Sequence, residues 1–313
     1  MMYRILGLHH VTATVDAAQP DLDFCLDLLG LRLVKKTVNF DNHHVYHFYY
    51  GNELGTPGTI WTTFPYHDRG VRVGVKGAGQ VVTTSFSVPT DSINWWRQRF
   101  VQHGLTVRTC VRLGATVLEV ADPSGLAIEV IGTADDARVP WTGNRVPTEN
   151  AIRGLHSVTM VVKELGPTVR LMLDVLGFVI VAQEGARTRL AAGPNAPGHF
   201  IDIVEDPRAE TAVNGLGTVH HVAMAIGSAD EQARLRDSLL QMGLKVTEVR
   251  DRCYFTSIYF REPGGVLFEV ATMQPGFTVD EDRLTLGRAL KLPTWEEEHR
   301  ADIEAHLVRV QYF

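Results

Sequence analysis

The sequence predicts an α+β protein built from four βαβββ modules, whose strands form paired, curved, mixed β-sheets. The first observation is that residues 8–12 (Leu-His-His-Val-Thr), 155–159 (Leu-His-Ser-Val-Thr) and 219–223 (Val-His-His-Val-Ala) are nearly identical. The second is that each stretch leads into a helical pattern ended by a glycine, and then into a strand that follows a proline-containing turn. Regular repetition of this kind is typical of modular architectures.

Module one sets the pattern for the others. Residues 21–29 form a short amphipathic pattern that predicts a helix, and Gly30 provides its C-terminal stop. Three strand-like runs follow, at residues 31–39, 45–50 and 59–64, the last one after a Gly-Thr-Pro-Gly turn.

The same pattern, a glycine after the helix and a proline-containing turn before the last strand, recurs three more times. In modules three and four the first strands open at His156 and His220, and the helices end before Gly177 and Gly243. The remaining predicted segments are the strand 81–88, the helix 92–103 and the strand 126–131 in module two, the strand 199–204 in module three, and the helix 230–242 and the strand 266–271 in module four.

A chain of 313 residues is long enough for two domains. We expect an N-terminal domain over residues 1–132, a linker rich in proline, glycine and charge over 133–150, and a C-terminal domain over 151–274. Residues 275–313 form a helical C-terminal tail, in which 284–292 and 295–307 show helical patterns. The tail is expected to cover a sheet edge or to pack on a partner subunit.

Composition excludes several classes of protein. The net charge is −6 and no long block of like charge occurs, so nucleic acid is not an expected partner. No run of 18 apolar residues and no signal-peptide pattern is present, which predicts a cytoplasmic protein without a membrane partner. The three cysteines are widely spaced and do not suggest disulfides.

Two histidines and one carboxylate fall at matched positions of the repeat. His10 and His221 take the same place on the first strands of modules one and four, and Glu269 lies on the last strand of module four. If modules one and four face one another, the three side chains converge in one cavity. Two histidines and a carboxylate on one face of an ion, with other positions open, are typical of non-heme Fe(II) oxygen chemistry. When the four modules are aligned on their proline turns, the position of Glu269 is taken by Thr63 in module one, Glu129 in module two and Ile203 in module three.

Modules two and three lack this ligand set. Their first-strand positions are assigned to Ser85 and Ser157, and Glu129 has no histidine partner, so we predict a degenerate second site and one working metal site per chain. A single histidine on a strand is more often a hydrogen-bonded or surface residue than a ligand, and the match across the repeat is what favours metal here. His43, His44 and His47 form a local cluster beside a turn, where alternation sends His44 and His47 to opposite faces of the strand, and we assign none of the three a site role.

The chain resembles the vicinal oxygen chelate superfamily, which has a glyoxalase-like fold. More narrowly, it resembles the hydroquinone ring-cleaving dioxygenases, which include the chlorohydroquinone 1,2-dioxygenases. The motifs are residues 8–12, 53–59 (Glu-Leu-Gly-Thr-Pro-Gly-Thr), 63–65 (Thr-Phe-Pro) and 261–269 (Arg-Glu-Pro-Gly-Gly-Val-Leu-Phe-Glu), and the likeness extends into the tail.

The resemblance implies Fe(II) held by His10, His221 and Glu269. Mn(II) binds similar oxygen-and-nitrogen sites and stays open as an alternative ion. The resemblance also implies catalytic roles for His220, Tyr259 and Arg252 and substrate-binding roles for Thr12 and His9. Strand alternation places Thr12 on the same side as His10. His9 and His220 adjoin ligands and should point away unless their strands are bulged.

The implied reaction is cleavage of a para-diol ring next to a hydroxyl group, with a small aromatic diol and dioxygen as substrates. His220 or Tyr259 could move protons, and Arg252 suits an anionic oxygen. Three alternatives stay open. They are an extradiol catechol dioxygenase, which Ser157 disfavours, a glyoxalase-type metal lyase, which Thr63 disfavours, and a metal-free binding protein. Ring substituents and oligomeric state are not specified by the sequence, and a homodimer is the commonest arrangement.

Overall fold

The computed structural model describes residues 4–143 and 145–312. Modules one and two each contain a first strand, a helix and three further strands. Module one consists of β1 (Ile5–Val15), α1 (Ala18–Leu22) with a π-helical continuation (Asp23–Leu28), β2 (Arg32–Asn39), β3 (Asn42–Gly51) and β4 (Ile60–Pro65). Module two consists of β5 (Gln80–Pro89), α2 (Ile93–Gln102), β6 (Arg108–Arg112), β7 (Ala115–Ala121) and β8 (Ala127–Thr133).

Modules three and four repeat this order. Module three consists of β9 (Gly154–Val162), α3 (Leu165–Asp174), β10 (Phe178–Glu184), β11 (Arg187–Ala192) and β12 (Phe200–Glu205). Module four consists of β13 (Thr218–Ile226), α4 (Ala229–Gln241), β14 (Arg250–Asp251), β15 (Thr256–Arg261) and β16 (Leu267–Thr272). The predicted α+β class and the four βαβββ modules are confirmed.

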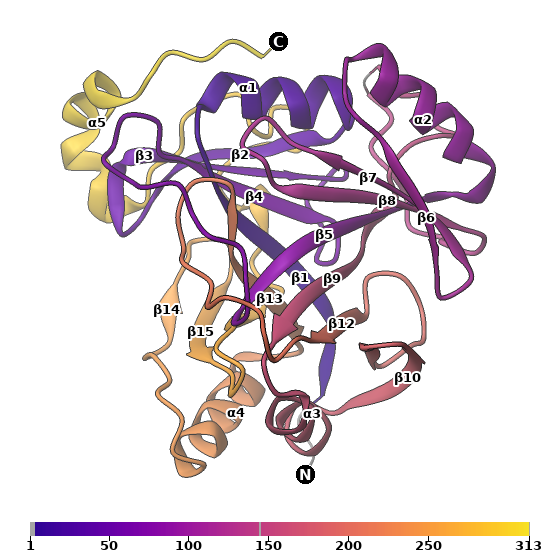
Figure 1. The fold of residues 1–313 in the computed structure, drawn as a ribbon. Coiled ribbons are helices and arrows are strands. Elements are labelled where there is room, and N and C mark those ends of the chain that lie inside the picture. Colours follow the sequence, from indigo (N-terminus) through magenta and orange to yellow (C-terminus); the bar gives the residue numbers. More distant parts are fainter. Residues whose placement is uncertain (1–3, 144, 313) are drawn as a thin grey trace.

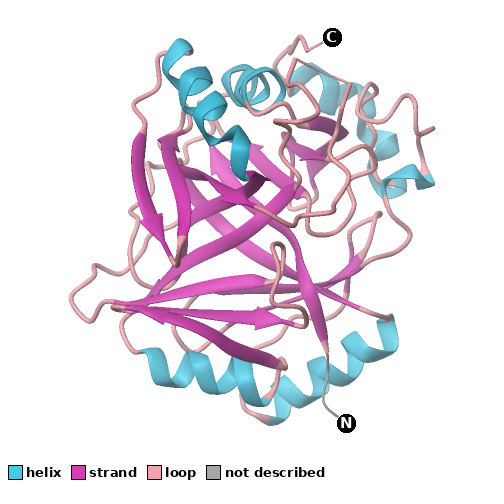
Figure 2. Cartoon of the chain, turned by 90° about the vertical axis from the view of Figure 1, so that its right-hand side faces the viewer, coloured by secondary structure: helices cyan, strands magenta, loops and turns pink. Residues whose placement is uncertain are grey.

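The strands form two curved, mixed, eight-stranded sheets (Figure 1). The first sheet joins modules one and four in the order β14-β15-β16-β13-β1-β4-β3-β2, and the second joins modules three and two in the order β10-β11-β12-β9-β5-β8-β7-β6. Helices lie on the outside of the sheets (Figure 2). The segment predicted as a linker joins β8 to β9 within the second sheet, so the division into residues 1–132 and 151–274 does not coincide with the two sheets.

A single apolar cluster contains residues from all four modules. Trp61 of β4 and Phe86 of β5 contribute rings from the two sheets with centroids 6.3 Å apart. On the helices, the apolar faces point inward, as the periodicity predicts: Trp96 and Phe100 of α2 are fully buried. This packing holds both sheets in fixed positions and thereby fixes the side chains on their central strands.

Strand pairing corrects the alignment of the last strands. In parallel register, Thr12 pairs with Thr62 and Ala223 pairs with Glu269. Because Thr12 and Ala223 each lie two residues after a predicted ligand, Thr62 rather than Thr63 corresponds to Glu269. By the same argument Asp202 replaces Ile203. The turns of modules one and three are one residue shorter than those of modules two and four, which shifts the alignment by one position.

The first strand of module two also needs a correction. His221 pairs with Thr12 across the centre of the first sheet, and the matching pair in the second sheet is Thr83 with Thr159. The residue at the place of His221 is therefore Thr83, whereas the sequence alignment gave Ser85. Ser157 keeps its assignment as the counterpart of His10.

The tail differs from prediction in its first part. Helix is confirmed near the end, as a 3-10 segment (Thr294–His299) followed by α5 (Arg300–His306), but the predicted helix over residues 284–292 is wrong. Gly287 has φ +78° and lies against the backbone carbonyl of Leu33, and Leu290 forms a bridge to Lys36 of β2. The chain here runs along the edge of the first sheet. None of the described helices is long and apolar enough to cross a membrane.

Candidate metal centre

Three side chains meet at the centre of the first sheet, from β1, β13 and β16. His10 Nε2 lies 3.3 Å from His221 Nε2 and 3.3 Å from Glu269 Oε2, and His221 Nε2 lies 2.8 Å from the same carboxylate oxygen. All three side chains are buried. The structure therefore brings together the three residues that the repeat singled out, with one donor atom of each facing the others.

The state of these groups suits a divalent metal ion. Glu269 Oε1 accepts a hydrogen bond from Ser257, whereas Oε2 is buried without a hydrogen-bond partner and faces the two imidazoles. Burial opposes ionisation of Glu269, but His10 and His221 hold its pKa well below the usual range. Burial lowers the pKa of His221 and favours the neutral imidazole. Two imidazoles and one carboxylate are a donor set that binds divalent metals, and the buried Oε2 without a hydrogen-bond partner fits the implied ion.

The histidines next to the ligands turn toward them, because both central strands are bulged. The pairing of β1 with β13 shifts between Leu8 and His10 and again opposite His220. His9 Nδ1 consequently lies 2.9 Å from His10 Nδ1, and His220 Nδ1 lies 2.8 Å from His221 Nδ1. The sequence predicts that His9 and His220 point away unless their strands are bulged. Both strands are bulged, so both side chains turn toward His10 and His221.

These contacts select the tautomer of each ligand. Burial, followed by the neighbouring ligand histidine, lowers the pKa of both His9 and His220 to about 3, so both are neutral. A neutral neighbour can accept the Nδ1–H of the ligand, which leaves the Nε2 lone pair of His10 or His221 directed at the centre. Such outer contacts are a regular feature of metal-binding histidines.

A cavity of about 330 Å³ opens over the three donor atoms. Its size is in the range used for small-molecule sites. Most of its wall is aromatic or cationic, and its lining residues include the triad together with Phe40, His47, Tyr49, Phe64, Tyr66, His220, Arg250, Arg252, Phe255 and Tyr259. A planar aromatic molecule in this cavity would therefore contact aromatic and cationic side chains.

Arg252 and Tyr259 act as a pair in the cavity wall. The Arg252 Nε–H donates to the Tyr259 hydroxyl over 2.9 Å, and the guanidinium lies 5.1 Å from the centroid of the tyrosine ring. Burial, and then the charge of Glu269, raise the pKa of Tyr259, so its phenol stays protonated. Because the phenol oxygen accepts from Arg252, its own O–H remains a donor toward a ligand.

Thr12 and His9 lie behind the wall and are not among its lining residues. His47 Nε2 lies 2.9 Å from Thr62 Oγ1, which in turn donates to Thr12 Oγ1 over 2.8 Å. His9 packs against Phe255 with centroids 4.8 Å apart. His9 therefore contacts a lining residue directly, whereas Thr12 is linked to one, His47, only through Thr62.

His47 and Ser257 are the residues that sequence reasoning missed. His47 lines the cavity, and Ser257 fixes the orientation of Glu269. The pairing of Tyr49 with Thr62 and of Tyr259 with Glu269 makes His47 and Ser257 equivalent positions of β3 and β15. Aligning the third strands of the modules, in addition to the first and last ones, would have found them.

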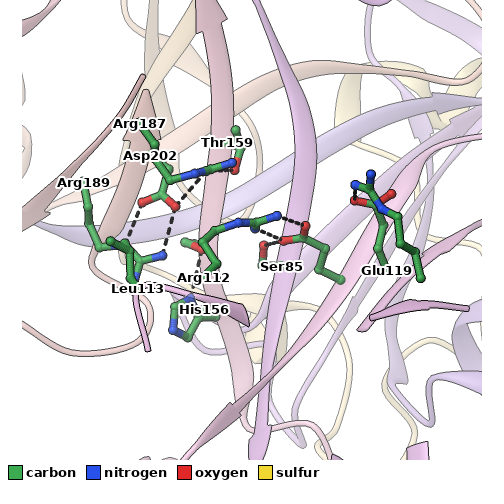
Figure 3. Close-up of polar contacts among 12 residues, drawn as sticks. Ser85, Arg112, Leu113, Glu119, His156, Thr159, Arg187, Arg189 and Asp202 are labelled. Carbon is green, nitrogen blue, oxygen red and sulfur yellow. Dashed lines mark hydrogen bonds and ion pairs between the residues drawn. The ribbon is translucent and has the colours of Figure 1, made fainter. Parts of the chain in front are cut away.

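The second sheet holds Ser157, Thr83 and Glu129 where the first sheet holds His10, His221 and Glu269, and arginines from neighbouring strands reach its carboxylates. Arg112 donates two hydrogen bonds to Glu129, of 2.7 and 2.8 Å, and Ser85 donates a third. Arg187 and Arg189 both reach Asp202 (Figure 3). Glu129 is thus neutralised from within the chain, as expected for a degenerate site. We call the set Arg112, Glu129, Arg187, Arg189 and Asp202 the arginine centre.

Comparison with known proteins gives consistent relatives. The family model of the glyoxalase/bleomycin resistance protein/dioxygenase superfamily matches residues 154–270. MhqE of Bacillus subtilis, named as a ring-cleaving dioxygenase, is 42% identical over 95% of this chain and 96% of its own. A chlorohydroquinone/hydroquinone 1,2-dioxygenase of Sphingobium indicum is 38% identical over 92% of each chain.

Solved structures agree on the fold. A Bacillus subtilis structure named as a dioxygenase superimposes with a TM-score of 0.95 and 38% identity over 99% of both chains. Glyoxalase I from maize superimposes with a TM-score of 0.63 and 12% identity over 85% of this chain and 92% of its own, and it shares the fold alone.

Proposed function

The chain belongs to the glyoxalase/bleomycin resistance protein/dioxygenase superfamily and is homologous to ring-cleaving dioxygenases, and from this premise we propose that it is an Fe(II)-dependent enzyme that cleaves hydroquinone-type para-diols with dioxygen. The observation that carries the proposal is the convergence of His10, His221 and Glu269 beneath a cavity with aromatic walls. The relative named for chlorohydroquinone and hydroquinone supports the substrate class.

His10, His221 and Glu269 would hold the ion through two Nε2 atoms and one carboxylate oxygen. When bound there, Fe(II) would supply the one-electron chemistry that lets dioxygen react with a closed-shell aromatic ring. The chain keeps the donors in place through Ser257 and through the two neighbouring histidines, and it provides the cavity in which the ring is oriented.

Proton transfer is assigned to His220 and Tyr259, which line the cavity on the side of His221. The protonated phenol of Tyr259 can donate to a substrate oxygen, and Arg252 can stabilise negative charge that develops on it. With its Nδ1 engaged by His221, the neutral ring of His220 offers Nε2–H as its donor.

Thr12 and His9 are proposed to act through their neighbours. Thr12 orients His47 by way of Thr62, and His9 orients the ring of His10 while packing on Phe255. Their contribution to substrate binding would therefore be the positioning of cavity-lining groups.

The test is oxygen uptake by anaerobically reconstituted Fe(II) protein, with hydroquinone and catechol offered separately. We expect uptake with hydroquinone, ring-cleaved product in equal amount, and loss of both in Glu269→Gln. Glu129→Gln, in the arginine centre, is the matched control and should retain turnover if it folds, which circular dichroism checks. Preference for catechol would assign the extradiol class, and no uptake with either diol would reject the dioxygenase proposal.

A further inference from the structure

A second group of histidines lies between the start of β3 and the helical tail. His43 and His44 have ring centroids 4.5 Å apart, and His44 stacks on His306 of α5 at 4.1 Å. The ring of His299 lies 6.1 Å from that of His43. Four of the chain's 13 histidines therefore gather on one part of the surface, although they come from segments more than 250 residues apart in sequence.

Carboxylates complete this group. His44 Nε2 lies 2.9 Å from Asp302 Oδ2. His306 Nδ1 donates to the backbone carbonyl of Asp302 over 2.8 Å and lies 3.4 Å from Asp302 Oδ1, so Nε2 is the atom of His306 left for an ion. His43 Nδ1 lies 2.8 Å from Glu296. One donor atom each of His43, His44 and Asp302 lies within 4.8 Å of the others. Asp302 thus faces two imidazoles, and the group contains more than three donors.

The donor set has a defined metal preference. Imidazole and carboxylate together suit borderline divalent ions, above all Zn²⁺, which takes four ligands and accepts water as one of them. The side chains of His43 and His44 are about one-third exposed, at 34% and 31%, so an ion can enter from solvent without a conformational change. Small rotations about the side-chain bonds would be enough to bring the donors to bonding distance.

We propose that His43, His44 and Asp302, with His306 as an adjacent donor, form a Zn²⁺ site that fastens the tail to the first sheet. This site is separate from the triad and does not depend on the proposed enzymatic function. We call it the tail site.

The tail site has a structural link to the cavity. The turn before His43 carries Asn39, Phe40 and Asp41, all of which line the cavity over the triad. Phe40 also contacts Trp295 of the tail, with ring centroids 5.7 Å apart. An ion bound at the tail site would fix both sides of this contact, and would therefore hold one part of the cavity wall in place.

Zn²⁺ alone is the probe, titrated into the metal-free full chain by calorimetry. We expect two equivalents to bind to the unmodified chain, one to His44→Ala, one to Glu269→Gln, and none of comparable affinity to the double variant. At the tail site the affinity should fall at least tenfold in His44→Ala. His103→Ala, which removes an exposed histidine elsewhere, is the control and should keep two equivalents.

Hydrogen exchange provides the second readout. In Glu269→Gln, Zn²⁺ should slow the exchange of amides in residues 300–306, and His44→Ala or His43→Ala should abolish this slowing. Two equivalents bound by His44→Ala and by His43→Ala, or a Glu269→Gln protein that binds no Zn²⁺, would overturn the tail site. If Glu269→Gln still binds two equivalents of Zn²⁺ while His44→Ala loses one, the result counts against the triad and not against the tail site. Each of the two proposals can therefore be contradicted without the other.

Discussion

The two sheets place different chemistry at the same positions. At the centre of the first sheet, His10, His221 and Glu269 present lone pairs to one point. At the matching positions of the second sheet stand Ser157, Thr83 and Glu129, and Arg112 supplies the cation. The carboxylate is kept in both sheets, and what differs is the source of the positive charge.

This difference teaches that the fold creates a buried carboxylate, while the neighbouring side chains decide how it is neutralised. Glu129 and Glu269 are each 1% exposed, and an isolated charge at such a depth would be strongly destabilising. In the second sheet the extra acid, Asp202, is accompanied by two arginines. In the first sheet its counterpart is the neutral Thr62, which needs no cation.

The largest effect is expected from breaking the first centre. Glu269→Gln keeps the size of the side chain and removes its charge, so metal affinity should fall by more than about 100-fold, beyond the loss usual for outer contacts. Bound metal is measured after dialysis against a chelator of known affinity. Retention of metal by this variant would mean that Glu269 is not a ligand.

Glu129→Gln should have the opposite profile. It leaves the guanidinium of Arg112, whose side chain is 12% exposed, without its charged partner, and the cost of about 3–5 kcal/mol for breaking a fully buried ion pair is the upper bound of the loss in folding free energy. Denaturant unfolding measures this loss, and metal content per folded chain should not change. A loss of metal with unchanged stability would invert the roles of the two sheets.

The variant Ser257→Ala removes from the first sheet a hydroxyl group that the second sheet lacks at the matching position. Pairing with the last strand places Val117 at the position of Ser257, so the second sheet lacks this hydroxyl. Loss of the hydrogen bond to Glu269 should weaken metal binding by about 10–100-fold. Competition with the same chelator reports the change, and unaltered affinity would show that Ser257 does not orient the ligand.

The last prediction compares the histidines that precede the two centres. Burial, and then the charge of Arg189, lower the pKa of His156 to about 3, so the folded protein keeps it neutral while the unfolded chain takes up a proton near pH 6.5. Stability is therefore lost as the pH falls from about 6.5 toward 3, by about 1.4 kcal/mol per pH unit for one such histidine.

The variant His156→Phe should take up one proton fewer on unfolding, which lowers the slope of the unfolding free energy against pH. Unfolding free energies at several pH values between 4 and 7 give the slope for both proteins. His9 and His220 contribute in the same direction in the metal-free protein, since burial lowers their pKa as well. An unchanged slope would show that His156 is protonated in the folded state.

The sequence was sufficient for the modules and for the convergence of His10, His221 and Glu269, because glycine and proline mark the repeat and these three residues differ from their counterparts in it. It was insufficient where a difference of one residue in turn length decides which residues of the last strands are equivalent. The shorter turns of modules one and three moved the alignment from Thr62 to Thr63 and from Asp202 to Ile203. Turn length affects register directly, and a one-residue shift exchanges the two faces of a strand.

A second group of features comes from contacts that local patterns do not contain. The bulges beside His9 and His220 depend on how β1 pairs with β13, which only the assembled sheet defines. The helical pattern of residues 284–292 was overridden by contact with the edge of the first sheet, where Gly287 approaches Leu33. Tertiary context outweighs local propensity in such segments.

The order of the modules along the chain has a consequence for synthesis on the ribosome. The second sheet is built from residues 80–205, so the arginine centre can assemble while the chain is still growing. His10 has to wait for His221, which is 211 residues away, before the first sheet can close. β1 stays without its partner β13 during this interval, and an unpaired strand edge of this kind favours mispairing.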